Sequence, residues 1–146
     1  MPTELFVHLN KLIRLDLTGN KIQAIPPEIC NMSSLLHLKL GSNQIAQFPQ
    51  EVTSLVQLIE LNLSANQIAM IRPDIENMTS LTELDLQKNK LKSLPITIGN
   101  LSKLKKLYLN DNLLGIKKIY TSVNFHSVYS TFFFFINLFN CLTITL

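Results

Sequence analysis

The sequence predicts an α/β solenoid: a right-handed superhelix with a parallel β-sheet on its concave face and short helical or 3-10 turns on its convex face. Three observations support this fold class. The chain repeats with a period of 23 residues, apolar and polar residues alternate in the first half of each unit, and a proline opens the second half. Periods of roughly 20 to 50 residues indicate solenoids, because a single unit cannot bury its apolar side alone.

The first half of each unit follows the pattern L-x-x-L-x-L-x-x-N-x-L, as in residues 81–91, LTELDLQKNKL. We number the positions of a unit from its first leucine. Position 1 is occupied by Leu12, Leu35, Leu58, Leu81 and Leu104. The asparagines at position 9 are Asn20, Asn43, Asn66, Asn89 and Asn112. About five units therefore follow one another without an insertion.

The alternation within a unit predicts a short β-strand. Leu15 and Leu17 alternate with the polar Arg14, Asp16 and Thr18, so a strand would bury the leucines and expose the polar side chains on its other face. Five such strands would stack as a parallel sheet. The asparagine that follows carries donors and an acceptor, and it can satisfy backbone groups where the chain leaves the strand.

The second half of a unit predicts a short helical turn. Pro26 follows the apolar Ile25, and proline suits the first position of a helical turn. Glu28, Glu51 and Asp74 recur in the first turn, where the helix dipole favours an acidic side chain. We therefore expect short helical turns on the side of the solenoid opposite the sheet.

We expect two segments, a repeat domain at residues 1–118 and an uncharged hydrophobic tail at residues 119–146. Every Asp, Glu, Lys and Arg lies between Glu4 and Lys118. Solenoids need terminal units with a polar outer face, and neither end of the repeat region supplies one. We therefore expect the repeat domain to be uncapped and the chain to be a piece of a longer array.

Three alternatives describe the tail. Residues 128–146 are uncharged and Lys117 and Lys118 precede them, which fits a membrane segment with cytosolic lysines. The tail could instead fold back as a cap over the exposed end of the sheet. The third alternative is a non-native terminus, since its bias toward Phe, Ile, Asn, Leu and Tyr is what A/T-rich nucleotide sequence encodes by chance.

The sequence offers no catalytic or metal-binding constellation. The histidines are scattered, no His or Cys pair has metal-ligand spacing, and the four glycines never form a phosphate loop. The lysines of the second half have no interleaved aromatic residues, which argues against nucleic-acid binding. We therefore expect no enzyme, no cofactor, no metal and no nucleic-acid partner. Cys30 and Cys141 cannot form a disulfide framework, which indicates a reducing compartment.

The candidate partner-binding residues are those that would project from the sheet at positions 3 and 5. They are Arg14, His37, Glu60, Glu83 and Lys106 at position 3, and Asp16, Lys39, Asn62, Asp85 and Tyr108 at position 5. Neighbouring strands lie about 4.8 Å apart, so Glu60 and Glu83 would lie side by side with Asp85 close and no basic residue between them. This predicts an acidic centre, flanked by Lys39, Lys106 and Tyr108, that meets a basic partner protein; the alternative is a solvated face.

The L-x-x-L-x-L-x-x-N-x-I/L pattern, followed by I-P-x-x-I-x-x-L, resembles the leucine-rich repeat family and its intracellular class. The nearest groups are the Ras-group scaffold proteins and the plant intracellular Ras-group-related proteins. The resemblance covers residues 12–114 and implies a continuous asparagine ladder. It also implies a cytoplasmic, non-catalytic scaffold in signalling, with a small GTPase as partner by analogy. The alternatives are a tail-anchored, membrane-associated repeat protein and a truncated fragment without independent function.

Overall fold

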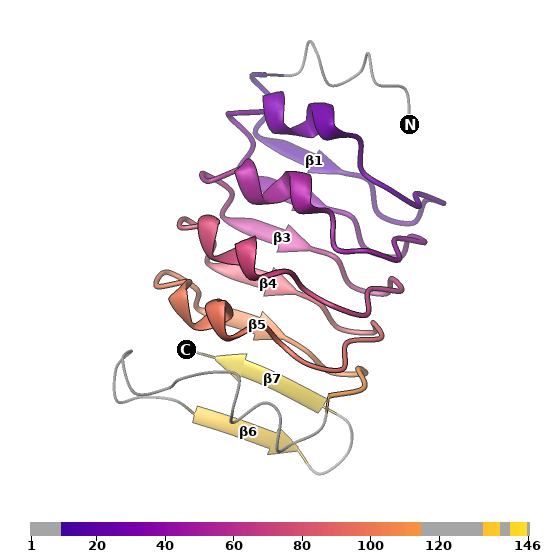
Figure 1. Cartoon of the computed structure of the whole chain (residues 1–146), viewed down its shortest axis with the longest axis vertical. Helices are drawn as coiled ribbons and strands as arrows, with labels where there is room; N and C mark the ends of the chain where they lie inside the picture. Colours follow the sequence, from indigo (N-terminus) through magenta and orange to yellow (C-terminus); the bar gives the residue numbers. More distant parts are fainter. Residues whose placement is uncertain (1–9, 115–132, 138–140, 146) are drawn as a thin grey trace.

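The computed structural model describes residues 10–114, 133–137 and 141–145, and it has two layers (Figure 1). One layer is a β-sheet, and the other contains a 3-10 turn from each of the first four units. The strands are β1 (Arg14–Asp16), β2 (His37–Lys39), β3 (Glu60–Asn62), β4 (Glu83–Asp85), β5 (Lys106–Tyr108), β6 (Phe133–Asn137) and β7 (Cys141–Thr145). The turns are η1 (Pro27–Asn31), η2 (Gln50–Ser54), η3 (Pro73–Asn77) and η4 (Ile96–Asn100).

The five repeat strands pair in parallel and in sequence order, β1 to β5. Each residue pairs with the residue 23 positions later, as Leu38 does with Leu61 and Leu61 with Leu84. The constant period therefore sets the register directly, and side chains from the same position of successive units stack in rows. Beyond β5, β7 pairs antiparallel with β5 and β6 antiparallel with β7.

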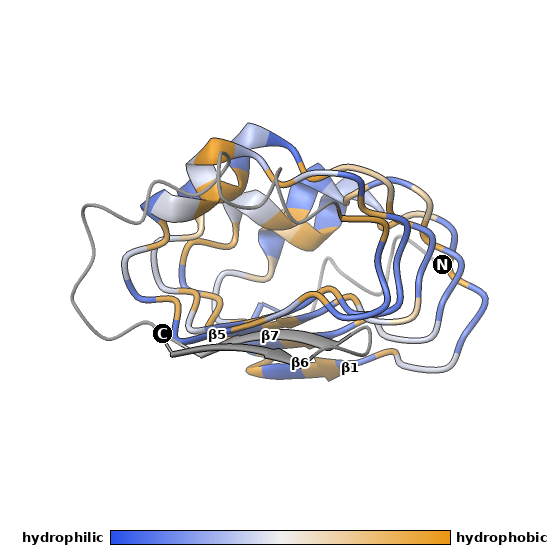
Figure 2. Ribbon diagram, turned by 90° about the horizontal axis from the view of Figure 1, so that it is seen from below, coloured by the Kyte–Doolittle hydropathy of each residue, from blue (hydrophilic) through white to orange (hydrophobic). Residues whose placement is uncertain are grey.

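The core lies between the sheet and the 3-10 turns, as Figure 2 shows in a view along the stack. Leucines at positions 1, 4 and 6 of the three middle units are fully buried, for example Leu58, Leu61 and Leu63. The residue that each turn contributes, such as Ile75 of η3, is buried against them. Leu12, Leu15 and Leu17 of the first unit are only partly buried. The alternation seen in the sequence is thus an alternation between core and surface.

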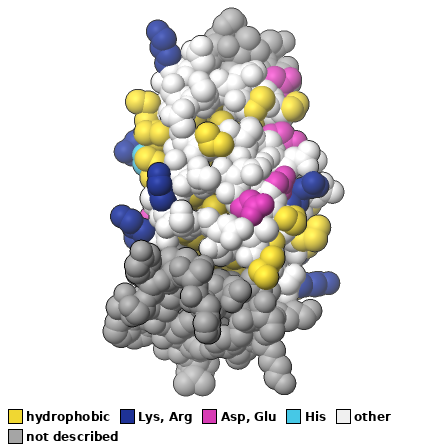
Figure 3. Space-filling model, turned by 60° about the vertical axis from the view of Figure 1, so that its left-hand side comes forward, with side chains coloured by type: hydrophobic (Ala, Val, Ile, Leu, Met, Phe, Trp, Pro, Cys, Tyr) yellow, Lys and Arg dark blue, Asp and Glu magenta, His cyan; other side chains and the backbone are white. Residues whose placement is uncertain are grey.

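Each 3-10 turn begins after a proline or arginine held in extended conformation. Pro26 precedes η1 with φ −71° and ψ 149°, and the turn closes where Met32 N donates to Ile29 O at 3.0 Å. Glu28, Glu51 and Asp74 lie in the first turns of η1 to η3. The predicted short turns are therefore 3-10 helices. In Figure 3, several acidic side chains run from the upper right into the middle of the view.

The chain leaves each strand through a left-handed residue at position 8. This residue is Gly19 in the first unit, with φ 74°, and a non-glycine residue in the other four, with φ between 52° and 56°. Those four are Ser42, Ala65, Lys88 and Asp111. A left-handed residue in every unit costs free energy in four of them, so strong neighbouring interactions must hold the turn.

The position-9 asparagines supply those interactions. Asn66 Nδ2 donates to Leu40 O at 2.9 Å, in the preceding unit, and to Leu63 O and Ser64 O at 3.1 Å. Its Oδ1 accepts from Ile45 N at 3.0 Å. Asn43, Asn89 and Asn112 make the same four contacts. These asparagines therefore join each unit to the one before it.

The hydrophobic tail lies largely outside the described residues. Within it the structure describes the backbone of β6 and β7, which continue the sheet past β5. In the described part of the chain, no helix has the length and apolar character needed to cross a membrane. Residues 119–132, 138–140 and 146 of the tail lie outside the described residues, and the three alternatives for residues 119–146 stay predictions.

Candidate functional site

The outer face of the sheet, which we call the concave face, carries the side chains of positions 3, 5 and 7. Position 4 points into the core between positions 3 and 5, as the buried Leu38, Leu61 and Leu84 show. The parallel register brings all ten predicted partner-binding residues onto β1 to β5, in two rows that cross the strands. The concave face is therefore one polar surface assembled from five units.

Glu60 is paired with basic residues of the preceding unit. His37 Nδ1 lies 2.9 Å from Glu60 Oε2, and Lys39 Nζ lies 3.4 Å from Glu60 Oε1. Partial burial raises the pKa of Glu60, but the hydrogen bond from His37 and the charge of Lys39 outweigh burial and lower the pKa below its ordinary value. The carboxylate of Glu60 is thus held in its charged form between two donors.

Glu83 is paired in the opposite direction. Lys106 Nζ, in the following unit, lies 3.1 Å from Glu83 Oε2, and this hydrogen bond and charge raise the pKa of Lys106. Glu60 and Glu83 are register partners, as expected, but their charges are compensated by different units. The acidic centre is flanked by Lys39 and Lys106, as expected, but both lysines form ion pairs with its glutamates, so its charge is compensated within the face.

Asp85 is buried, although the alternation placed it among the projecting residues. Its exposed fraction is 9%, and burial raises the pKa of its carboxyl above the ordinary value. Its Oδ2 accepts from Asn62 Nδ2 at 3.1 Å and from Gln87 Nε2 at 3.2 Å, and its Oδ1 accepts from Gln87 N at 3.1 Å. Asp85 contributes to the face mainly by orienting its neighbours.

A chain of hydrogen bonds extends from Asp85 across three units. On one side, Asn62 Oδ1 accepts from Ser64 Oγ at 2.7 Å, and on the other, Asn110 Nδ2 donates to Gln87 Oε1 at 3.1 Å. Gly41 makes room for this network, because a Cβ there would lie 2.9 Å from Asn62 Oδ1 and 3.0 Å from Ser64 Oγ.

Three of these side chains, Ser64, Gln87 and Asn110, belong to position 7, as does Gly41. This row was missing from the predicted site. The spacing itself could have identified it, since position 7 continues the alternation of positions 3 and 5 along the strand. The hydrogen bonds could not be read from the sequence, because they depend on which neighbouring unit each side chain turns toward.

In three units the position-5 side chain also accepts a hydrogen bond from the backbone N–H two residues later, as described above for Asp85 and Gln87. Asp16 Oδ1 accepts from Thr18 N at 2.9 Å, and Asn62 Oδ1 accepts from Ser64 N at 2.9 Å in the same way. The hydrogen bond from Thr18 lowers the pKa of Asp16. Short side chains with an acceptor oxygen thus satisfy the N–H group two residues later, at the end of the strand.

The remaining predicted residues lie at the two ends of the face. Arg14 and Asp16 are exposed on β1, and Tyr108 is half-buried on β5 beside the Glu83–Lys106 pair. Among the residues that the structure describes, no group of three His, Cys, Asp or Glu side chains could hold a metal ion. The geometry of the face is that of a polar contact surface with its charges compensated internally.

The comparisons with known proteins agree with this architecture. A family model described as "Leucine-rich repeat region" matches residues 3–112. The chain belongs to the leucine-rich repeat family. No curated protein sequence matches the chain. Leucine-rich repeat domains are generally non-enzymatic scaffolds that bind other proteins.

Several solved leucine-rich repeat structures superimpose on the chain. A leucine-rich repeat protein of Leptospira interrogans is 32% identical with a TM-score of 0.77, over 81% of this chain and 30% of that one. An internalin of Listeria monocytogenes is 29% identical with a TM-score of 0.70, over 85% of this chain and 36% of that one. The chain therefore spans about a third of the length of these two relatives.

A third similar structure is a receptor ectodomain in complex with a factor that it binds. The leucine-rich repeat ectodomain of the Arabidopsis thaliana membrane receptor kinase GASSHO1/SCHENGEN3, with CASPARIAN STRIP INTEGRITY FACTOR 2, is 41% identical to this chain. Its TM-score is 0.70, and the match covers 78% of this chain and 14% of that one. Binding of another protein or peptide thus occurs on this fold.

Proposed function

We propose that this leucine-rich repeat chain is a non-catalytic scaffold in intracellular signalling that binds a partner protein through its concave face. The observation that supports this proposal is that each unit combines constant core positions with variable surface positions. Positions 1, 4, 6 and 9 are shared by the units and build the solenoid, whereas positions 3, 5 and 7 differ from unit to unit on the concave face. A surface that varies on a constant frame is suited to specific recognition.

The internal ion pairs favour a partner with charges of both signs. Glu60 is bound by His37 and Lys39, and Glu83 by Lys106, so neither acidic nor basic groups dominate the face. Each of these side chains can exchange its partner within the chain for an oppositely charged group on the bound protein. This exchange costs little folding stability, because such partly exposed ion pairs contribute little to it. Electrostatic complementarity would then fix the register of binding more than its strength.

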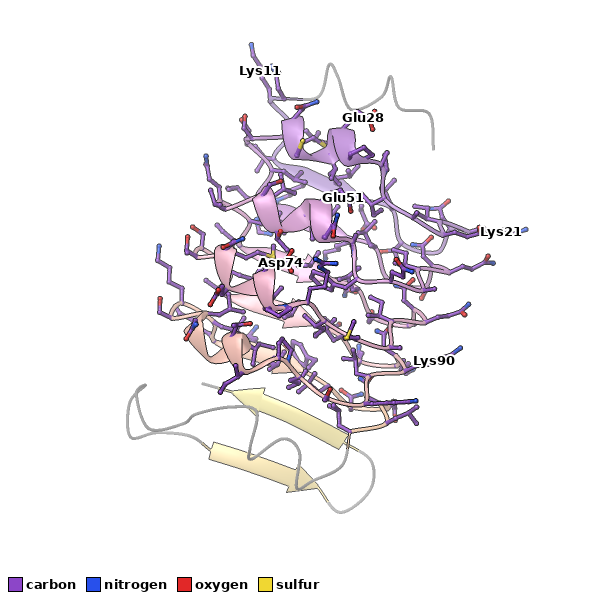
Figure 4. The ribbon with its side chains drawn as sticks, viewed as in Figure 1. Lys11, Lys21, Glu28, Glu51, Asp74 and Lys90 are labelled. Carbon is purple, nitrogen blue, oxygen red and sulfur yellow. The ribbon has the colours of Figure 1, made fainter. Side chains whose placement is uncertain are left out.

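The test is affinity capture with the whole chain, followed by identification of the bound protein and comparison of two double variants. The concave variant carries Glu60→Lys and Glu83→Lys. The convex control carries Glu28→Lys and Glu51→Lys on η1 and η2, where Figure 4 shows both side chains on the turn layer. We expect the concave variant to weaken capture by at least about tenfold and the convex control to leave it nearly unchanged.

Folding is checked on the same samples. The Glu60→Lys substitution places a third basic side chain beside His37 and Lys39, which can destabilise the fold. Thermal unfolding of each variant is therefore measured together with capture. The neutral pair Glu60→Gln and Glu83→Gln removes the charges without adding repulsion and is expected to weaken capture to a smaller degree. Equal effects of the concave and convex substitutions in folded protein would reject the concave face as the docking surface.

Two finer proposals rest on the resemblance to the Ras-group repeat proteins. The partner would be a small GTPase, and the protein would act in the cytoplasm. Binding of the whole chain to a purified Ras-type GTPase, loaded with GDP or with a non-hydrolysable GTP analogue, tests the first. Cell fractionation tests the second, and recovery that depends on detergent would instead support the membrane-associated alternative.

A further inference from the structure

A second surface lies beside the concave face, at the edge of the sheet where the strands begin. Position 2 of the five units holds Ile13, Leu36, Ile59, Thr82 and Lys105. Their backbones form one continuous ladder: each N–H donates to the position-2 carbonyl of the preceding unit, at 2.8 to 2.9 Å. The side chains of this row are therefore neighbours, one per unit.

The first three members of this row are apolar and accessible. Ile13 is 53% exposed, Leu36 and Ile59 are half-buried, and Val56, in the link that leads into β3, is 48% exposed. Figure 3 shows apolar side chains gathered on this side, beside the described histidine. Contiguous exposed apolar side chains indicate an interaction site more strongly than single ones do.

Among the residues that the structure describes, the charged side chains along this edge are basic. Lys11 precedes the first member of the row, Lys105 is its last member, and Lys103 lies two residues before Lys105; all three lysines are exposed. The links between the turns and the strands, residues 32–36, 55–59, 78–82 and 101–105, contain no acidic residue. The nearest carboxylates, Glu60 and Glu83 at position 3, are paired with His37, Lys39 and Lys106. An apolar centre between basic ends favours a partner with an apolar stripe and acidic ends.

The spacing of the row indicates the form of that partner. Successive units are about 4.8 Å apart, so Ile13 and Ile59 are separated by about 10 Å. Residues on one face of an α-helix recur about every 5.4 Å, which matches this spacing over two turns. Residues on one face of an extended strand recur at about 6.6 Å and fall out of step.

We propose that this strand-entry edge, made of Ile13, Leu36, Val56 and Ile59 between Lys11 and the pair Lys103 and Lys105, binds an amphipathic helix of a partner protein. The helix carries one apolar side chain per turn and acidic side chains near both ends. It lies across the strands, and from the first to the fifth unit it spans about 19 Å, or roughly 13 residues. This site is separate from the concave face and does not depend on it.

The test uses a fluorescein-labelled synthetic peptide of about 16 residues and the whole chain, with binding followed by fluorescence anisotropy. The peptide is helical, with leucines at i, i+4 and i+7 and glutamates near both ends. A second peptide replaces the glutamates with lysines, and a third keeps the composition but scrambles the leucine spacing. We expect only the first peptide to bind well, with the others weaker by at least about tenfold.

Matched pairs of variants test where on the molecule the peptide binds. Ile13→Gln removes an exposed apolar side chain from the edge, and Ile96→Gln removes the same kind of side chain, 62% exposed, from η4. Lys103→Glu with Lys105→Glu reverses the basic end, and Lys90→Glu with Lys92→Glu makes the same change where the strands end. We expect the edge variants to weaken binding at least about fivefold and the matched controls to leave it unchanged.

Several outcomes overturn the proposal. They are absence of binding by the acidic peptide, equal binding of the lysine-ended peptide, and equal losses in edge and control variants. All four lysines are exposed, so the charge variants are expected to fold even if a substitution at Ile13 disturbs the first unit. Glu60→Lys with Glu83→Lys separates the two surfaces: if it abolishes peptide binding while the edge variants do not, the peptide occupies the concave face and this inference fails.

Discussion

Asn66 shows how one side chain can stabilise two units of the solenoid. Its amide makes four hydrogen bonds to backbone groups and is 8% exposed, whereas Asn20, in the first unit, makes two bonds to described residues and is exposed. Both of these bonds of Asn20 go to carbonyls of its own unit, whereas Asn66 also bonds Leu40 O and Ile45 N of the preceding unit. Asparagines at the same position of different units are therefore expected to contribute different amounts to the free energy of unfolding.

We predict that Asn66→Ala lowers the free energy of unfolding by about 2–4 kcal/mol, because it leaves a buried N–H and buried carbonyls without partners. Asn20→Ala, the matched control, is expected to cost less than about 1 kcal/mol. Urea unfolding followed by circular dichroism measures both. Losses of equal size would mean that the ladder is not the source of the stability.

The pairing of Glu60 predicts a pH dependence. Its folded pKa is lowered, so the stability that its charge contributes is present above the unfolded pKa and is lost as pH falls through the folded pKa. We expect the wild type to exceed Glu60→Gln in unfolding free energy near neutral pH, by less than about 1 kcal/mol since the pair is partly exposed.

The gap between wild type and Glu60→Gln should close as pH falls from about 6 to about 3. Asp85 provides a contrast of opposite sign, because burial raises its pKa and its contribution to stability therefore falls as pH rises through that range. Urea midpoints of wild type, Glu60→Gln and Asp85→Asn over this range test the two signs. A gap for Glu60→Gln that widens on acidification would contradict the assigned pairing.

At the scale of the element, a unit consists of one three-residue strand, one left-handed turn and one 3-10 turn, and it contacts its two neighbours. This description could be read from the sequence because the 23-residue period and the alternation of Leu15 and Leu17 with polar residues fix both the strand and its register. Proline at the start of the second half likewise indicated the turn, although its 3-10 form is a property of the folded chain.

We predict that deletion of residues 58–80, one complete unit, leaves a folded solenoid, because Leu81 then takes the place of Leu58 in the same register. The denaturant dependence of unfolding should fall by roughly a fifth, in proportion to the surface buried. Circular dichroism and urea unfolding provide the measurement.

Deletion of residues 58–77, three residues fewer, is the control. It shifts the leucine and asparagine positions out of register and should abolish cooperative unfolding. Equal folding of the two deletion variants would show that the nearest-neighbour description of the solenoid is wrong.

At the scale of the whole molecule, the solenoid carries surfaces of different character. The concave face has compensated charges, the turn layer carries Glu28, Glu51 and Asp74, and lysines such as Lys21 and Lys90 lie at the edge where the strands end (Figure 4). Each surface arises from rows of one position repeated in successive units. A partner that binds along one row therefore contacts several units at once.

The candidate site was less predictable than the fold. The rows of positions 3 and 5 follow from the period, but the period places Glu60 equally close to units on both sides and does not say which one its side chain contacts. Asp85 lies at a projecting position, as expected, but it is buried and hydrogen-bonded to Asn62 and Gln87. Side-chain conformation, which the spacing does not encode, decides these contacts.

The most direct test of the proposal that the concave face binds the partner is carboxyl footprinting of the complex. Glutamates are labelled with a carbodiimide and an amine, in the free chain and with the captured partner, and quantified by mass spectrometry. The proposal predicts that labelling of Glu60 and Glu83 falls in the complex while labelling of Glu28 and Glu51 stays the same. Protection of Glu28 and Glu51, with Glu60 and Glu83 unchanged, would contradict it.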